Sequence, residues 1–285
     1  MRTLPGTMIF GAGGQLGREI STMMPDAIAF VHSGTARALH VEVISELDHA
    51  FRSIQPDIVI NASAMTDVEG CQTDKGRAYA VNANAVLDMA TLCRKHGSRL
   101  YHISTDYVFS GREGNYSESA IPDPINYYGF SKSMGDAFAL SHENSLIIRT
   151  SGVYGYSRNF PIFVYQSLAA GKQIKVIRGF YSPIHARSLA TAIADLIRNQ
   201  EDLTGIINIA GERVSRMHLA RSIAGKFDLD INLISEVDEI AGFKAARPFD
   251  SSLDISYAKS ILRTDFYSLD HNLNLFGYSM TGEKK

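Results

Sequence analysis

The glycine-rich stretch GAGGQLG, at residues 11–17, constrains the fold of this chain more than any other feature. It follows the short apolar run TMIF and opens an amphipathic helical pattern. In such a loop one glycine permits a tight turn, a second lets the backbone approach a pyrophosphate, and a third allows close packing of helix on sheet. The first helical N–H groups and the helix dipole then favour phosphate binding. The loop predicts a dinucleotide-binding unit whose cofactor contacts come from Gly11, Gly14, Gln15, Leu16 and Gly17.

Short apolar runs alternate with helical patterns through the first half of the chain. The expected strands are 7–10, 27–32, 57–63, 99–105 and 145–151, and the helices between them are 14–24, 43–54, 78–97 and 128–140. A further helix at 188–200 and a strand at 205–211 follow. Apolar strands alternating with amphipathic helices predict a parallel sheet covered on both faces. We therefore expect an α/β fold, a Rossmann-type doubly wound parallel sheet with a smaller C-terminal substrate-binding lobe.

This pattern also predicts the domain boundaries. Residues 1–151, with about 180–211 returning to the sheet, are expected to form the NAD(P)-binding domain. Residues 152–179 and 212–285 are expected to form the substrate-binding lobe, because periodicity weakens there and turn residues and aromatics increase.

Composition argues against several classes of function. The net charge is −2 with no basic block, which does not suggest a nucleic-acid partner. The two cysteines and nine histidines lack metal-ligand spacing, so no metal site is expected. The N-terminus lacks a signal-peptide pattern, and no apolar stretch approaches the length of a membrane span. These features indicate a cytoplasmic protein without a membrane or nucleic-acid partner.

The end of the second strand bears on the choice of cofactor. A carboxylate there would bind the adenosine ribose and favour NAD. Here the strand ends in Val31, His32 and Ser33 with no acid, and Arg37 follows shortly. We expect NADPH, with His32 and Ser33 near the adenosine ribose; NADH remains an alternative. Arg37 is either a phosphate partner or a solvated loop residue.

Candidate reactive groups follow the third and fourth strands and begin the helix YYGFSK. Tyr128 and Lys132 share a helix face, and a nearby ammonium lowers the pKa of a phenol, which suits a proton donor. Tyr127 has no lysine four residues on. The simpler alternative is a packed ring beside a solvated lysine. Residues expected at the cofactor from strand ends are Asn61, Ala62, Ser63, Ala64 and Ser104, with Thr105 beside them.

The ordered set of motifs resembles one family. NASAMTDVEGC, STDYVFSG, NYYGFSK, IIRTSGVYG and ARPFDSSLD together are similar to the dTDP-4-dehydrorhamnose reductases, which are extended short-chain dehydrogenase/reductases. The likeness runs from about Thr7 to about Tyr267. It implies hydride transfer from NADPH to the C4 keto group of a dTDP-4-keto-6-deoxy sugar, in dTDP-L-rhamnose biosynthesis. It also implies that Tyr128 donates the proton, Lys132 binds the nicotinamide ribose, and Thr105 orients the substrate carbonyl.

The resemblance suggests further contacts with alternatives left open. Asn82 matches an asparagine near the cofactor, or it makes a structural bond inside its helix. Asp106 and Tyr107 would face the sugar, although Tyr107 could equally pack in the core. Arg247 would bind a phosphate bidentately, or it is a surface arginine before a proline.

Two departures bear on the substrate. Gly152 stands where the family usually has a bulky aromatic, typically tryptophan. RGFYSPIHA, at 178–186, keeps Pro183 but lacks an acid and an amide that the family usually has there. Arg178 is either a phosphate ligand or an ordinary loop cation. These changes leave the fold and cofactor expectations in place and put the identity of the sugar in doubt.

The alternatives are a reductase of another nucleotide sugar and a protein of a different class. The regulatory subunit of methionine adenosyltransferase resembles the same family and binds NADP, and intact Thr105, Tyr128 and Lys132 do not exclude it. An epimerase or dehydratase fits less well, because Asp106 is followed by Tyr107 rather than by glutamate. The family likeness allows a homodimer.

Overall fold

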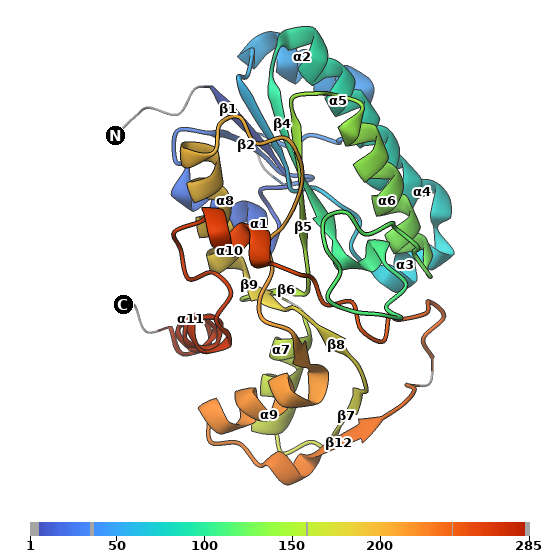
Figure 1. Ribbon diagram of the computed structural model, residues 1–285, viewed down its shortest axis with the longest axis vertical. Coiled ribbons are helices and arrows are strands. Elements are labelled where there is room, and N and C mark those ends of the chain that lie inside the picture. Colours follow the sequence, from blue (N-terminus) through green and yellow to red (C-terminus); the bar gives the residue numbers. More distant parts are fainter. Residues whose placement is uncertain (1–5, 35–36, 158, 241, 283–285) are drawn as a thin grey trace.

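The computed structural model describes residues 6–34, 37–157, 159–240 and 242–282, and it contains a parallel sheet between two layers of helices (Figure 1). The sheet has six strands in the order β10-β5-β4-β3-β1-β2, and every neighbouring pair is parallel. Its strands are β1 (Thr7–Phe10), β2 (Ile28–Phe30), β3 (Ile58–Asn61), β4 (Arg99–Thr105), β5 (Ser145–Thr150) and β10 (Gly205–Asn208). The predicted doubly wound α/β fold is confirmed.

Alternating strand side chains supply two separate cores. Ile9 of β1 packs on one face, while its neighbours Met8 and Phe10 pack on the other, as the pleat of a strand requires. The first face is covered by α1 (Gln15–Met23), α8 (Ala186–Asn199) and α10 (Ser256–Ile261). The second is covered by α2 (Ile44–Ile54), α5 (Ala85–His96) and α6 (Tyr127–Leu140). Both faces are therefore buried, which is why the strands are continuously apolar.

The helix expected at 78–97 begins earlier and is interrupted. After α3 (Val68–Thr73), α4 (Lys75–Tyr79) leads into a π-helical turn, Ala80–Asn84, before α5. Asn82 in this turn accepts a hydrogen bond from Met65 N at 2.8 Å, and its Nδ2 donates to Met65 O and Ser131 Oγ at 3.0 Å each. The π turn thus ties the loop after β3 to α6 through Asn82, which makes the structural bond; its cofactor contact stays a prediction.

A smaller region extends below the sheet in Figure 1. Its elements are β6 (Val153–Tyr154), α7 (Phe160–Ala169), β7 (Ile174–Ile177), β8 (Phe180–Tyr181), β9 (Ile184–His185), β11 (Val214–Ser215), α9 (Arg216–Lys226), β12 (Ile234–Val237) and α11 (Leu269–Thr281). Most of them share an apolar cluster that is separate from the sheet cores. Ala258, Leu262 and Phe266 instead join the α1/α8 core, so this part of 212–285 packs on the sheet.

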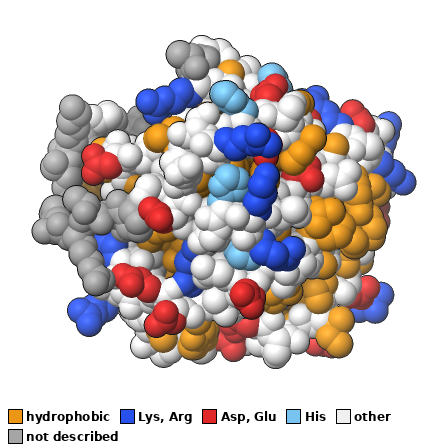
Figure 2. Space-filling view, turned by 90° about the horizontal axis from the view of Figure 1, so that it is seen from above, with side chains coloured by type: hydrophobic (Ala, Val, Ile, Leu, Met, Phe, Trp, Pro, Cys, Tyr) orange, Lys and Arg blue, Asp and Glu red, His pale blue; other side chains and the backbone are white. Residues whose placement is uncertain are grey.

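The surface carries both signs of charge. Seen from above, basic, acidic and histidine side chains share one face, and hydrophobic side chains gather toward one side of it (Figure 2). Exposed apolar residues include Leu87 on α5 and Phe130 and Leu140 on α6. None of the helices within the described ranges is long and apolar enough to cross a membrane.

Candidate functional site

Three neighbouring pockets lie where the strands of the sheet end. The β2 pocket, of about 310 Å³, is lined by the glycine loop and by residues after β2 and β3. The central pocket, of about 480 Å³, is lined by the start of α1, the end of β4 and the first turns of α6. The lobe pocket, of about 530 Å³, lies mostly against the smaller region. Gly14, Ala62 and Ala64 line the first two pockets, and Asp106, Tyr107 and Gly152 line the last two, so the three adjoin in series.

The glycine loop has the close approaches that its sequence predicts. A Cβ on Gly11, whose φ is +83°, would lie 2.5 Å from Ser63 N, and one on Gly17 would lie 2.2 Å from Gly11 O. Neither position therefore accepts a side chain. Gly14, the N-cap of α1, provides no side-chain cap, which leaves N–H groups of the first turn free for an anion. Gly14, Gln15, Leu16 and Gly17 all line the central pocket, as the cofactor prediction requires.

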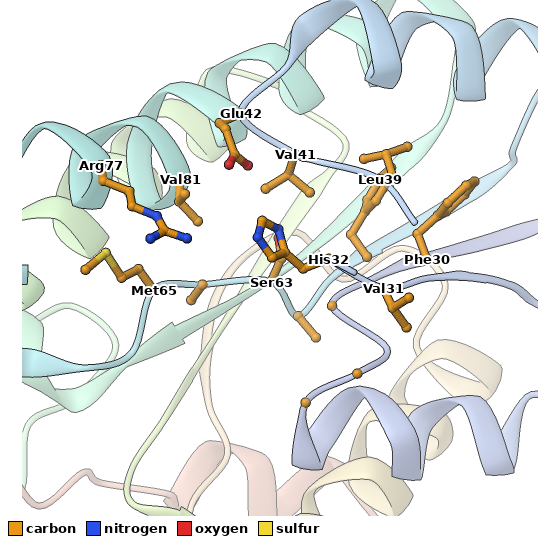
Figure 3. Close-up of a pocket in the computed structure, with 16 residues that line it drawn as sticks. Phe30, Val31, His32, Leu39, Val41, Glu42, Ser63, Met65, Arg77 and Val81 are labelled. Atoms are coloured by element: carbon orange, nitrogen blue, oxygen red, sulfur yellow. The ribbon is translucent and has the colours of Figure 1, made fainter. Parts of the chain in front are cut away.

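The β2 pocket is lined by residues of both charges (Figure 3). His32 lines it as expected, whereas its described lining includes neither Ser33 nor Arg37. Glu42 and Arg77, which the sequence analysis missed, do line it. Glu42 Oε2 is buried and has no hydrogen-bond partner among the described residues. The segment before α2 thus places a carboxylate in this pocket, which no pattern in the sequence indicated.

Thr105, Tyr128 and Lys132 meet in the central pocket. Asn126 caps α6 by accepting from Gly129 N at 2.8 Å. A Cβ on Gly129 would lie 2.0 Å from Tyr107 O, so glycine lets the start of α6 press against the segment after β4. Lys132 Nζ donates to Ile103 O at 2.7 Å. The cap and this contact hold the Tyr128 phenol and the Lys132 amine beside the end of β4, where both residues line the same pocket.

Burial sets the ionisation of these groups. Burial raises the pKa of Tyr128, and the hydrogen bond with the Thr105 side chain opposes that rise only in part. Burial lowers the pKa of Lys132 to about 8, although the Asp136 carboxylate acts in the other direction. The expected lowering of the tyrosine pKa by Lys132 is therefore wrong for this structure, because desolvation dominates. A phenol with a raised pKa stays protonated at neutral pH and can still act as a proton donor.

Of the remaining cofactor residues predicted at the strand ends, four line the pockets and Asn61 is fully buried. Ala62, Ser63, Ala64 and Ser104 line the pockets. Asn61 is fully buried, accepts from Ser63 N at 3.1 Å and faces His102 Nδ1 with its Nδ2 at 3.2 Å. Both ends of the Asn61 amide are engaged within the protein, and the cofactor contact expected of Asn61 stays a prediction.

Asp106 and Tyr107 both line the central and lobe pockets. The Asp106 carboxylate accepts from Ser151 Oγ at 2.7 Å and Ser251 Oγ at 2.5 Å, and Thr105 Oγ1 donates to it at 3.1 Å. It joins three segments, and these three hydrogen bonds leave an acceptor position on its Oδ1, so the sugar contact expected of it stays a prediction. The Tyr107 ring lies edge-on to Tyr128 at 5.7 Å, at the border of both pockets.

The lobe pocket combines cations with aromatic rings. Lys175, Arg216 and Arg247 line it together with Phe160, Phe163, Tyr181 and Phe243. Arg247 Nη2 donates to Glu69 Oε1 at 3.0 Å, while Nη1 of Arg216 and Nη1 of Arg247 are buried without a hydrogen-bond partner in the described chain. Such unpaired donors are costly unless a ligand satisfies them. Apart from Arg247, these residues were not predicted, because they come from separate elements with no common motif.

Gly152 and the RGFYSPIHA segment, the two places where the sequence departs from the family pattern, lie next to each other. Gly152 has φ of +40°, and a Cβ there would lie 2.6 Å from Cε2 of Tyr181, which belongs to the altered RGFYSPIHA segment. The Tyr181 ring therefore occupies the space beside residue 152. Arg178 pairs with Glu236 at 3.2 Å and Asp238 at 3.3 Å and does not line the described lobe pocket, so the loop-cation alternative fits it better.

Comparison with known proteins identifies relatives along nearly the whole chain. A family model described as RmlD substrate binding domain matches residues 6–276. The spore coat polysaccharide biosynthesis protein SpsK of Bacillus subtilis is 32% identical over 246 residues, which are 85% of this chain and 86% of that protein. A hypothetical dTDP-4-dehydrorhamnose reductase from Sulfolobus tokodaii is 47% identical, with a TM-score of 0.89 over 93% of this chain and 97% of the other. A dTDP-4-dehydrorhamnose reductase from Bacillus anthracis, solved in complex with NADP, is 29% identical, with a TM-score of 0.88 over 96% and 98% of the two chains.

Proposed function

Because this chain belongs to the RmlD substrate-binding domain family, we propose that it is an NADPH-dependent reductase of a nucleotide-linked keto sugar. One observation carries the proposal. Thr105, Tyr128 and Lys132 line the same pocket as the start of α1, and that pocket adjoins a second one lined by cations and aromatic rings. A dinucleotide and a sugar nucleotide would therefore have adjoining sites. The two pockets share Asp106, Tyr107 and Gly152, and the Tyr107 ring lies 5.7 Å from that of Tyr128.

The pockets fit a nicotinamide dinucleotide. The adenosine would occupy the β2 pocket, the pyrophosphate would lie at the uncapped start of α1, and the nicotinamide would reach Thr105 and Lys132 in the central pocket. The bound cofactor supplies the hydride. NADPH is favoured because the similar reductase from Bacillus anthracis was solved with NADP. His32 and Arg77 can donate hydrogen bonds to a phosphate there, while the Glu42 carboxylate would accept from a hydroxyl or an amine.

The residues of this chain supply the remaining chemistry. As hydride reaches the carbonyl carbon, negative charge develops on its oxygen, and a protonated Tyr128 donates the proton that neutralises it. Thr105 Oγ1 accepts from Tyr107 N at 3.2 Å, which fixes its hydroxyl beside the phenol. Lys132 would donate to the nicotinamide ribose.

The proposed substrate is a dTDP-4-keto-6-deoxy sugar reduced at C4, as the family resemblance implies. Arg216 and Arg247 would bind its diphosphate, because both arginines line the lobe pocket and a guanidinium pairs bidentately with phosphate. Phe160, Phe163 and Phe243 offer rings on which a base could stack. SpsK and the reductases share this family, so another nucleotide sugar is the alternative substrate.

Absorbance of NADPH, then of NADH, after addition of dTDP-4-dehydro-L-rhamnose tests the proposal. Tyr128→Phe should lower kcat by roughly 10²–10⁴ while cofactor binding is retained, because it removes only the acidic proton. Tyr127→Phe is the matched control, since Tyr127 is not among the described residues that line the central pocket and is followed four residues later by Ser131 rather than by a lysine. Tight cofactor binding without oxidation would contradict the reductase proposal and favour the regulatory-subunit alternative. The expected homodimer is checked in the same preparation by its mass in solution.

A further inference from the structure

Asn61, at the end of β3, has an amide whose orientation is determined by its neighbours. Its Oδ1 accepts from the backbone N–H of Ser63 at 3.1 Å and from Ser63 Oγ at 2.5 Å. A backbone N–H can only donate, so the atom that faces it must be the amide oxygen. The Asn61 NH₂ group consequently points at His102 Nδ1, 3.2 Å away.

This contact determines the tautomer of His102, which lies on β4 and is fully buried. The Asn61 NH₂ group has no lone pair to offer, so Nδ1 must accept the hydrogen bond. Burial and the nearby Lys132 hold the pKa of His102 well below its ordinary value, so the imidazole is neutral. A neutral imidazole that accepts at Nδ1 carries its proton on Nε2.

The Nε2–H group faces the lysine of the proposed site. Lys132 Nζ lies 3.2 Å from His102 Nε2. An ammonium has three donors and no acceptor, so in the charged form two donors face each other. A neutral amine has a lone pair that can accept the Nε2–H. The contact is thus a hydrogen bond only when Lys132 is uncharged.

We infer that Asn61 and His102 act as a positioning pair that favours the neutral amine of Lys132 over the ammonium. Ser63 orients Asn61, Asn61 sets the tautomer of His102, and His102 presents its N–H to the lysine. Through this chain of hydrogen bonds, the segment that lines the cofactor pockets governs the charge of a residue expected to bind the cofactor. The effect on cofactor binding rests on the proposed reductase function. The tautomer of His102 and the charge of Lys132 do not depend on it.

The carboxylate of Asp136 acts in the opposite direction. Asp136, one turn later on α6, favours the ammonium, but it is shared with Arg149 of β5, whose Nε lies 3.3 Å from Asp136 Oδ2. Asp136 Oδ1 is 3.9 Å from His102 Nε2, which is too long for a hydrogen bond. Tyr128, one turn earlier, remains protonated because its pKa is raised. The lowered pKa of Lys132, about 8, agrees with this balance.

The first test reads the tautomer directly. In the full-length protein with ¹⁵N-labelled histidine, long-range ¹H–¹⁵N correlation distinguishes an Nε2–H imidazole from an Nδ1–H imidazole, and His102→Gln assigns the signal. We expect the Nε2–H tautomer at neutral pH. An Nδ1–H tautomer or an imidazolium would overturn the inference, whatever the protein reduces.

The second test reverses the arrangement. Asn61→Asp keeps an acceptor for Ser63 N–H but also accepts from Nδ1–H, so His102 would expose a lone pair at Nε2 and accept from the ammonium. We expect the pKa of Lys132, followed by the ¹³Cε shift of labelled lysine and assigned with Lys132→Arg, to rise by about one unit or more. The control is Asn61→Asp in a His102→Leu background, which keeps the added charge without the imidazole. An equal rise in both backgrounds would show a simple charge effect and contradict the relay. If the aspartate variant does not fold, the wild-type tautomer still decides.

Discussion

Lys132 shows how a single buried charge shapes the proposed site. Its side chain is 1% exposed and donates to Ile103 O, so the ammonium has little water to solvate it. Burial lowers its pKa from an ordinary 10.5 to about 8. A basic group with a lowered pKa destabilises the folded state below that pKa, because the unfolded chain binds the proton more tightly. This cost decreases above pH 8 and disappears as the pH rises through 10.5, the ordinary pKa of lysine.

Lys132→Met should therefore stabilise the protein while abolishing its proposed activity. At pH 7 we expect the free energy of unfolding to rise by about 1–3 kcal/mol. The gain should shrink between pH 8, near which folded Lys132 loses its proton, and pH 10.5, near which the lysine of the unfolded chain loses its own. Urea unfolding at pH 7 and near the upper end of that window measures both values. A gain that does not change with pH would mean that packing rather than ionisation is responsible.

Arg247 is the residue whose predicted phosphate role the tertiary structure makes testable. Its side chain is 17% exposed in the lobe pocket, and one of its donors is unpaired. Arg247→Met should raise KM for the sugar nucleotide by roughly 10- to 100-fold with a smaller change in kcat, since a charged hydrogen bond contributes about 1.5–3 kcal/mol. Arg178→Met is the matched control. Arg178 is 54% exposed in surface ion pairs, so its loss should change KM little.

At the scale of elements, the junction of β1 and α1 depends on backbone contact. A Cβ on Gly17 would lie 2.2 Å from Gly11 O and 2.7 Å from Gly11 C, so a side chain there would push α1 away from the glycine loop. The same displacement would move the N–H groups expected to bind the pyrophosphate. Helix position and cofactor affinity are thus linked through one glycine.

Gly17→Ala should weaken cofactor binding at least about tenfold and lower stability by about 1–3 kcal/mol, the usual cost of overpacking. Calorimetric titration with NADPH and thermal unfolding measure the two effects. Gly225→Ala is the control within a helix, α9, because its Cβ would meet nothing within 4 Å. Alanine there should be neutral or stabilising by up to about 1 kcal/mol. Equal behaviour of the two variants would contradict the backbone-contact argument.

At the scale of the whole molecule, Gln15 joins the glycine loop to the segment before α7. Its Oε1 accepts from Ser157 N at 3.1 Å and Asn159 Nδ2 at 3.2 Å, and its carbonyl accepts from Tyr156 OH at 2.9 Å. The segment that leads into the smaller region is therefore attached at the expected pyrophosphate site. Cofactor binding and the position of that segment should influence each other.

Gln15→Ala should increase hydrogen exchange in the segment from β6 to α7 and weaken NADPH binding several-fold, because two hydrogen bonds of about 1 kcal/mol each are removed. Exchange detected by mass spectrometry, with and without NADPH, measures the coupling. Gln166→Ala, at an exposed position of α7, should leave both unchanged. Unaltered exchange in the Gln15 variant would show that the segment is held by other contacts.

Features that depend on neighbours along the chain could be predicted from the sequence. GAGGQLG, the alternation of apolar strands and helices, and the four-residue spacing of Tyr128 and Lys132 are local patterns, because turn geometry and helix periodicity act over a few residues. The order of motifs was enough to identify the family. The smaller lobe and the central site were predicted from that order of motifs rather than from any single motif.

Which distant residues share an environment depends on how the chain folds. Glu42 and Arg77 enter the β2 pocket, Tyr181 lies against Gly152, and His102 meets Lys132, although no spacing in the sequence connects these pairs. The direction of the tyrosine pKa shift was missed for the same reason. A charge four residues away is visible in the sequence, but desolvation depends on everything that packs around the group, and that is a property of the folded chain.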